Sequence, residues 1–129
     1  MNPGDRLPEW TLPITPTLVV STAIATRDFQ DVHHDRDLAQ SYGSKDIFVN
    51  ILTSNGLVQR YVTDSLGADL LVRSIKIRLG APAYPGDTLT FTGEVSSAEG
   101  DEVTVAVRGS VAAGNHVSGT VVVSRGGTP

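Results

Sequence analysis

The stretch NILTSNGLVQRYVTDSLG, residues 50–67, carries the one long helical pattern of the chain. Asn50 is a favourable N-cap residue, and Gly67 stands where a glycine commonly follows the end of a helix. Between them, apolar side chains recur at helical spacing at Ile51, Val58, Tyr61, Val62 and Leu66. The pattern predicts a helix about 24 Å long, at about 1.5 Å per residue. Its apolar stripe needs a second layer of structure to cover it.

Gly56 lies inside this predicted helix, where glycine costs about 1 kcal/mol relative to alanine. The missing side chain can permit close packing against a sheet, or it can leave room for a ligand. We expect close packing. The ligand alternative keeps Gly56 among the candidate substrate-binding residues.

Beyond residue 70 the hydrophobic period changes from helical to alternating. Apolar and polar residues alternate over 74–79, 88–95 and 103–108, and a fourth apolar segment covers 117–124. Turn residues separate these segments: PAYPGD (82–87), AEGD (98–101) and AAGN (112–115). The pattern predicts an antiparallel meander whose apolar face wraps the helix. The expected fold class is therefore α+β, with a curled antiparallel sheet around one central helix.

The segments before the helix are less regular. Residues 1–16 contain four prolines, so we expect an extended lead-in rather than a helix. TLVVSTAIA, residues 17–25, is rich in β-branched side chains and favours a strand. Asp35 can cap a short helix that Gly43 ends. With a flexible tail at 125–129, residues 1–129 are expected to form a single domain.

Composition narrows the function classes. The formal net charge of −4 argues against nucleic-acid binding, which normally requires a basic stripe. The absence of cysteine excludes disulfides, thiolate nucleophiles and iron–sulfur clusters. No apolar run approaches the length of a membrane span, and the first residues do not resemble a signal peptide. We therefore expect a cytoplasmic protein without a membrane or nucleic-acid partner.

A charged segment, RDFQDVHHDRDLA (27–39), precedes the helix and carries the candidate catalytic residues Asp28 and His33. On a regular helix the two would be about 140° apart, given about 3.6 residues per turn, so they can converge only in a loop. A carboxylate and an imidazole that share one water can take a proton from it and deliver another. On composition alone a solvated loop is the simpler interpretation, and a metal site is the weakest, since His33 and His34 are adjacent and His116 is remote.

The same segment resembles the hydratase motif of MaoC-like (R)-specific enoyl-CoA hydratases, G-D-x-N-P-[LIV]-H-x5-[AS]. DFQDVH (28–33) matches at its aspartate, valine and histidine, and Ala39 matches the final position. Three positions differ, because Arg27, Gln30 and Asp31 replace the glycine, asparagine and proline of the motif. IFVNILT (47–53) is similar to the family's I-A-H-G-M-L-T, with asparagine for glycine.

This resemblance implies a hot-dog fold and hydration of a trans-2-enoyl-CoA. Catalysis would fall to Asp28 and His33, with neither assigned as the base. Backbone N–H groups near the start of the helix would polarise the thioester carbonyl. The implied substrate-binding residues are Gln30, Val49, Asn50, Ile51 and Gly56. No metal and no cofactor are expected, apart from the coenzyme A that the substrate carries.

The longer matches, RDFQDVHHD with GSKDIFVNIL and GLVQRYVTD, resemble one branch of the family, the small subunits of actinobacterial steroid side-chain hydratases. That branch implies a steroid, cholesterol-type acyl group and a second MaoC-like subunit bearing an OB-fold (DUF35) domain, in a heterotetramer. Four basic residues are candidates for binding the CoA phosphates: Arg60, Arg73, Lys76 and Arg78. The alternative is that they belong to a solvated face of the sheet.

Three other functions stay open. A non-catalytic hot-dog subunit could complete a partner's active site, and an acyl-CoA-binding scaffold would need no catalytic pair. A hot-dog thioesterase ranks lowest, because the central helix carries no carboxylate until Asp64.

Overall fold

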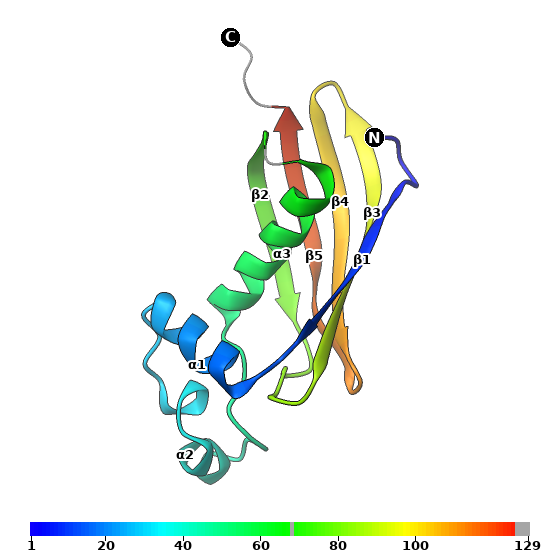
Figure 1. Ribbon diagram of the computed structural model, residues 1–129. Coiled ribbons are helices and arrows are strands. Elements are labelled where there is room, and N and C mark those ends of the chain that lie inside the picture. The colour runs from blue at the N-terminus through cyan, green and yellow to red at the C-terminus, as the bar shows by residue number, and fades with distance from the viewer. Residues whose placement is uncertain (68, 126–129) are drawn as a thin grey trace.

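The computed structural model describes residues 1–67 and 69–125, which build one five-stranded antiparallel sheet and a long helix across its concave face (Figure 1). The elements in chain order are β1 Arg6–Pro13, α1 Pro16–Ala25, a 3₁₀ turn Asp31–His33, α2 Arg36–Ser41, α3 Ile51–Leu66, β2 Leu70–Leu79, β3 Thr88–Glu99, β4 Glu102–Val111 and β5 Gly114–Arg125. The strand order in the sheet is β1-β3-β4-β5-β2. None of the described helices is both long and apolar enough to cross a membrane.

Helix α3 forms as its sequence predicts. The side chain of Asn50 accepts a hydrogen bond from the Thr53 amide, which satisfies one of the free donors of the first turn. Gly67 follows the last residue of the helix, and its φ of 124° is one that residues other than glycine rarely adopt. The buried stripe of α3, including Val58, Tyr61 and Val62, faces the sheet.

The core lies between α3 and the inward faces of the strands. Leu89, Phe91 and Val95 of β3 are almost fully buried, as are the alternating valines of β4 and β5. Phe91 stacks on Trp10 of β1 and Tyr61 of α3, with ring centroids 5.2 and 5.6 Å apart. Strand alternation over the second half of the chain is therefore confirmed.

Two predictions for the first 25 residues need correction. The apolar segment 17–25, predicted as a strand, is helix α1, because Thr15 caps its first turn and Pro16 occupies the first helical position. The lead-in 1–16 is extended as expected, but part of it is strand β1, which pairs with β3 along the sheet. The predicted short helix is confirmed as α2, with Asp35 as its N-cap.

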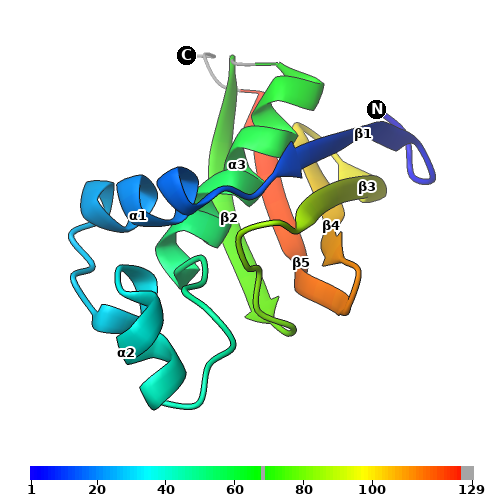
Figure 2. The same cartoon turned by 60° about the horizontal axis from the view of Figure 1, so that its bottom comes forward.

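The meander prediction holds only for β3, β4 and β5. Strand β2 does not join β3 but pairs with β5, so β1 and β2 form the two edges of the sheet (Figure 2). Helix α3 separates β1 from β2 in the chain, and β3, β4 and β5 fill the middle of the sheet. The predicted tail lies outside the described residues, except for Arg125, the last residue of β5.

Candidate active site

The catalytic candidates lie on a loop between α1 and α2, at the N-terminal end of α3 (Figure 1). Helix α1 ends at Ala25, and the hydroxyl of the next residue, Thr26, donates back to the carbonyl of Thr22. Arg27 then turns the chain with φ 56°, the left-handed conformation, and the Asp28 amide donates to the carbonyl of Ala23. This turn aims the Asp28 side chain back toward α3.

The structure brings Asp28 and His33 together. Asp28 Oδ2 lies 3.3 Å from His33 Nε2, although the two residues are five positions apart. The short 3₁₀ turn Asp31–His33 supplies the irregular backbone that this convergence requires. The His33 side chain is 6% exposed and that of Asp28 is 20% exposed. A nearly buried imidazole thus faces a carboxylate that water can reach.

The hydrogen bonds of His33 determine which ring nitrogen takes part in chemistry. Nδ1 lies 2.7 Å from the carbonyl oxygen of Phe48, and a carbonyl can only accept, so Nδ1 carries a proton. The Phe48 ring packs edge-on against the imidazole at 4.9 Å. Nε2 is therefore the nitrogen that can exchange a proton with Asp28 or with a bound water.

The Asp28 carboxyl has a pKa below its ordinary value. Partial burial raises the pKa. Hydrogen bonds from the Gln30 amide and the Asn50 side chain, together with the charges of His33 and His34, lower the pKa by more than burial raises it. Asp28 is consequently ionised at neutral pH.

Three predicted binding residues lie at the start of α3. The Val49 amide is unavailable to a substrate, because it donates to the carbonyl of Ala83 at 3.1 Å. Among the described residues, the amides of Asn50 and Ile51 have no hydrogen-bond partner. The buried Asn50 side chain donates hydrogen bonds to Thr26 Oγ1, at 2.8 Å, and to Asp28 Oδ2, at 3.2 Å. The sequence did not predict these bonds, because the N-cap role already accounted for the asparagine.

The other two predicted binding residues are exposed. Gln30 approaches Asp28 through its backbone amide, 3.2 Å from Oδ1. Gly56 does not pack against the sheet, so that prediction is wrong. A Cβ built at Gly56 would meet nothing within 4 Å, because the glycine lies on the face of α3 turned away from the core.

The other two histidines, His34 and His116, make hydrogen bonds that connect parts of the fold. His34 Nε2 lies 2.6 Å from the Asp28 carbonyl, and its ring lies near that of Phe29. His116 is 2% exposed and joins Ser54 Oγ on α3 to the Ala81 carbonyl. Within the described residues, no group of three or more acidic or histidine side chains could hold a metal ion.

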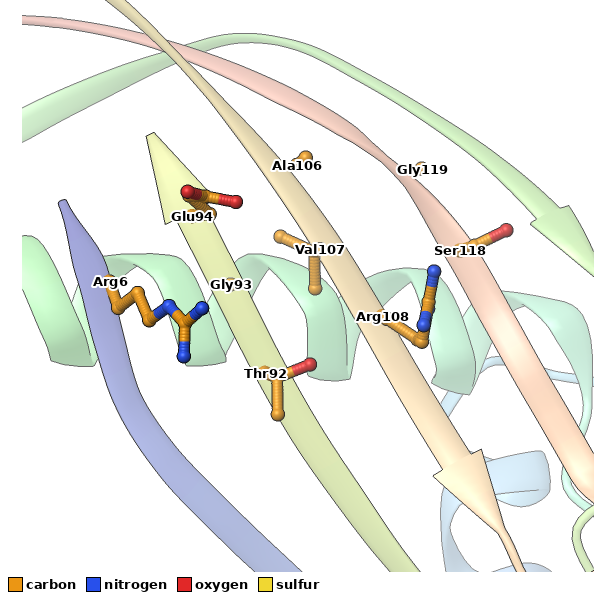
Figure 3. A pocket seen from close by; sticks show the side chains of 9 residues that line it. All are labelled: Arg6, Thr92, Gly93, Glu94, Ala106, Val107, Arg108, Ser118 and Gly119. Atoms are coloured by element: carbon orange, nitrogen blue, oxygen red, sulfur yellow. The ribbon is translucent and has the colours of Figure 1, made fainter. Parts of the chain in front are cut away.

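A cavity of about 470 Å³ lies elsewhere, over strands β1, β3, β4 and β5 (Figure 3). Arg6, Glu94 and Arg108 are among its lining residues, and neither Asp28 nor His33 is. Of the basic candidates for CoA phosphates, Arg60 pairs with Asp64 and Arg73 bonds Ser124. Lys76 and Arg78 are exposed on β2.

Comparison with known proteins places this geometry in a family. A model described as a MaoC like domain matches residues 3–119. The 3-oxo-4,17-pregnadiene-20-carboxyl-CoA hydratase beta subunit of Mycobacterium tuberculosis (strain ATCC 25618 / H37Rv) is 59% identical over 121 residues, which are 94% of each chain.

Solved structures agree with this assignment. A chain in the crystal structure of the ChsH1-ChsH2 complex from Mycobacterium tuberculosis is 57% identical, with a TM-score of 0.94 over 96% of this chain and 98% of that one. The (R)-hydratase from A. caviae involved in PHA biosynthesis has a TM-score of 0.89 over 98% of both chains, at 19% identity, and shares the fold. The predicted hot-dog fold is confirmed, and the close relative is a hydratase, as predicted. With a family model over residues 3–119 and 59% identity across almost its whole length, this chain belongs to the MaoC-like family.

Proposed function

We propose that this chain is the catalytic subunit of an enoyl-CoA hydratase, which adds water across a trans-2-enoyl-CoA double bond. The observation that carries the proposal is the approach of Asp28 Oδ2 to His33 Nε2 at 3.3 Å, beside the unpaired amides of Asn50 and Ile51.

The pair supplies the proton transfers. A water held by both groups would lie within hydrogen-bond reach of the Asp28 carboxylate and of His33 Nε2. It loses one proton to the pair as its oxygen bonds to Cβ, and the pair returns one proton to Cα. The two amides would polarise the thioester carbonyl, where negative charge develops. Nothing is oxidised or reduced, so the proposal requires no cofactor besides the CoA of the substrate.

A bulky apolar acyl group suits the surroundings of the pair. Phe29 is 68% exposed, and Ile51 and Leu52 are each 54% exposed, all close in sequence to the catalytic groups or the helix start. Large apolar side chains in contact with water commonly mark a binding surface. Together with the steroid substrate in the name of the 59% identical relative, they support a steroid side-chain thioester as the substrate.

We also propose a partner subunit, a second MaoC-like chain with an OB-fold (DUF35) domain, in a cytoplasmic heterotetramer. The relative is a beta subunit, and the matched crystal structure is a complex of two proteins. Strand β2 is the edge we propose for pairing, because Leu71 and Leu79 are 48% and 40% exposed. Strand β1 is blunted by Pro8 and charged Glu9, which disfavour edge pairing.

The function is tested with Asp28→Asn and His33→Ala in the chain copurified with its coexpressed partner. We expect each change to lower turnover by about 10²- to 10⁴-fold, because one proton-transfer group is lost. Loss of enoyl-thioester absorbance measures turnover, and circular dichroism and co-elution check folding and assembly. Turnover retained in both variants would remove the catalytic assignment. Activity on crotonyl-CoA but not on steroid enoyl-CoA would remove the steroid substrate.

A further inference from the structure

The side chain of Asn50 connects three parts of the site. Its Oδ1 accepts from the Thr53 amide of α3 at 3.1 Å. Its Nδ2 lies 2.8 Å from Thr26 Oγ1, at the end of α1, and 3.2 Å from Asp28 Oδ2 on the loop. With 2% of its surface exposed, Asn50 makes these bonds away from bulk water.

Helix capping alone does not explain an asparagine here. Serine, aspartate and asparagine cap helices about equally well. Thr26 and Asp28 both present oxygen atoms, so the residue between them needs two N–H donors as well as an acceptor. Aspartate has no donor when ionised and serine has one, whereas the asparagine amide has two donors and one acceptor. All three are used.

We propose that Asn50 is a positioning residue. Its side-chain amide fixes the position of the Asp28 carboxylate relative to the backbone amides at the start of α3. This inference rests on the proposed hydratase function. One residue would thereby set the spacing between the group that handles the water and the N–H groups that hold the thioester oxygen. A misplacement of about 1 Å between such groups can cost about 100-fold in rate.

The inference predicts an electrostatic signature. The titratable groups that act on Asp28 are His33 and His34 of the same loop, while α1 and α3 contribute the non-titrating Thr26 and Asn50. Asn50→Ser keeps the cap but removes a bond that favours the carboxylate, so the Asp28 pKa should rise. Asn50→Asp keeps the shape but places a second carboxylate beside Asp28, so the pKa should rise further.

The experiment compares these two variants with the wild-type chain, each copurified with the partner. For Asn50→Ser we expect kcat to fall about 10- to 100-fold with little change in KM. The acidic limb of the kcat/KM profile should move to higher pH, and further still in Asn50→Asp. Thr15→Ala, which removes the N-cap of α1 at the end remote from Asp28, controls for a general loss of helix stability and should keep the wild-type profile.

A second readout does not depend on turnover. NMR titration of the labelled Asp28 carboxyl carbon should show the pKa rising from wild type to Asn50→Ser to Asn50→Asp. An unchanged kcat and pKa in Asn50→Ser would overturn the inference, as would losses equal to those in Thr15→Ala. If the wild-type complex shows no hydratase activity, the proposed function fails, and the titration alone then decides whether Asn50 acts on Asp28.

Discussion

Arg27 is the residue at which the loop with Asp28 and His33 leaves helix α1, and its backbone is in the left-handed conformation, at φ 56°. The hydratase motif that this segment resembles has glycine at the position, and the structure gives a physical reason for that preference. A side chain here costs roughly 1–2 kcal/mol, because Cβ approaches the following carbonyl oxygen. The turn is nevertheless retained, since the Arg27 and Asp28 amides are bonded to the carbonyls of Ile24 and Ala23.

Arg27→Gly should therefore stabilise the fold. The relief of strain exceeds the greater entropy that glycine gives the unfolded chain, which leaves a gain of about 0.5–1 kcal/mol. Arg27→Val should destabilise it, because a β-branched residue tolerates positive φ least. Urea unfolding of both variants measures the difference. A valine variant as stable as the glycine variant would contradict the strain argument.

Sequence reasoning at this scale found some contacts and missed others. The approach of Asp28 to His33 was predictable from the motif and from the need for an irregular loop. The two bonds from Asn50 to Thr26 and Asp28 were not, because capping already accounted for the asparagine and the partners lie 24 and 22 residues away. Such distant polar contacts leave no periodic signal in a sequence.

At the scale of elements, α1 shows how propensity is overridden. Its valines, threonines and isoleucine favour a strand, yet the capping threonine and the following proline start a helix. Only Val19 and Ala23 are buried in it, and the hydrophobic pattern is too uniform to show a helical face. Helix α3 was predictable because its buried stripe and both of its ends carry clear signals.

His116 of β5 joins α3 to the loop after β2, and its burial predicts that stability depends on pH. Burial lowers its pKa from 6.5 more than its bond to the Ala81 carbonyl and the charge of Asp87 raise it. Below about pH 6.5 the unfolded chain therefore binds a proton that the folded chain does not. Stability gained from the neutral form is lost as the pH falls, with a limiting slope of about 1.4 kcal/mol per pH unit for one proton.

His116→Gln should flatten this dependence. Glutamine does not titrate, so the unfolding free energy of the variant should fall less between pH 7.5 and 5.5 than that of the wild type. Urea unfolding across this range measures both slopes, and every other titrating group is the same in the two proteins. Equal slopes would show that His116 does not titrate between the folded and unfolded states.

At the scale of the molecule, the strand order was the least predictable feature. The alternation of apolar and polar residues predicts where each strand lies in the sequence and which of its faces is buried. It does not predict which strands are neighbours in the sheet. The pairing of β2 with β5 rather than β3 is a long-range contact that the alternation does not specify. The consequence is that apolar Leu71 and Leu79 lie on an open edge.

Leu79→Lys should weaken assembly with the partner, because a paired edge would bury the new charge. We expect the dissociation constant to rise at least about tenfold, which corresponds to about 1.4 kcal/mol. Analytical ultracentrifugation of the coexpressed subunits measures it. Thr92→Lys adds the same charge on the exposed outer face of β3 and serves as the control. Wild-type assembly of Leu79→Lys would point away from β2 as the contact.

The pairing of β1 with β3 also bears on how the chain folds during synthesis. Residues 6–13 leave the ribosome long before 88–99, the strand with which they pair. Contacts of such separation form slowly, since a long loop must close first. The hairpins of the C-terminal half can form as soon as they emerge, because their strands are close in sequence. The segment with Asp28 and His33 has no complete scaffold until the last strands emerge. In a chain truncated after β3, the first fifty residues should therefore be cleaved more readily by proteases than in the full chain.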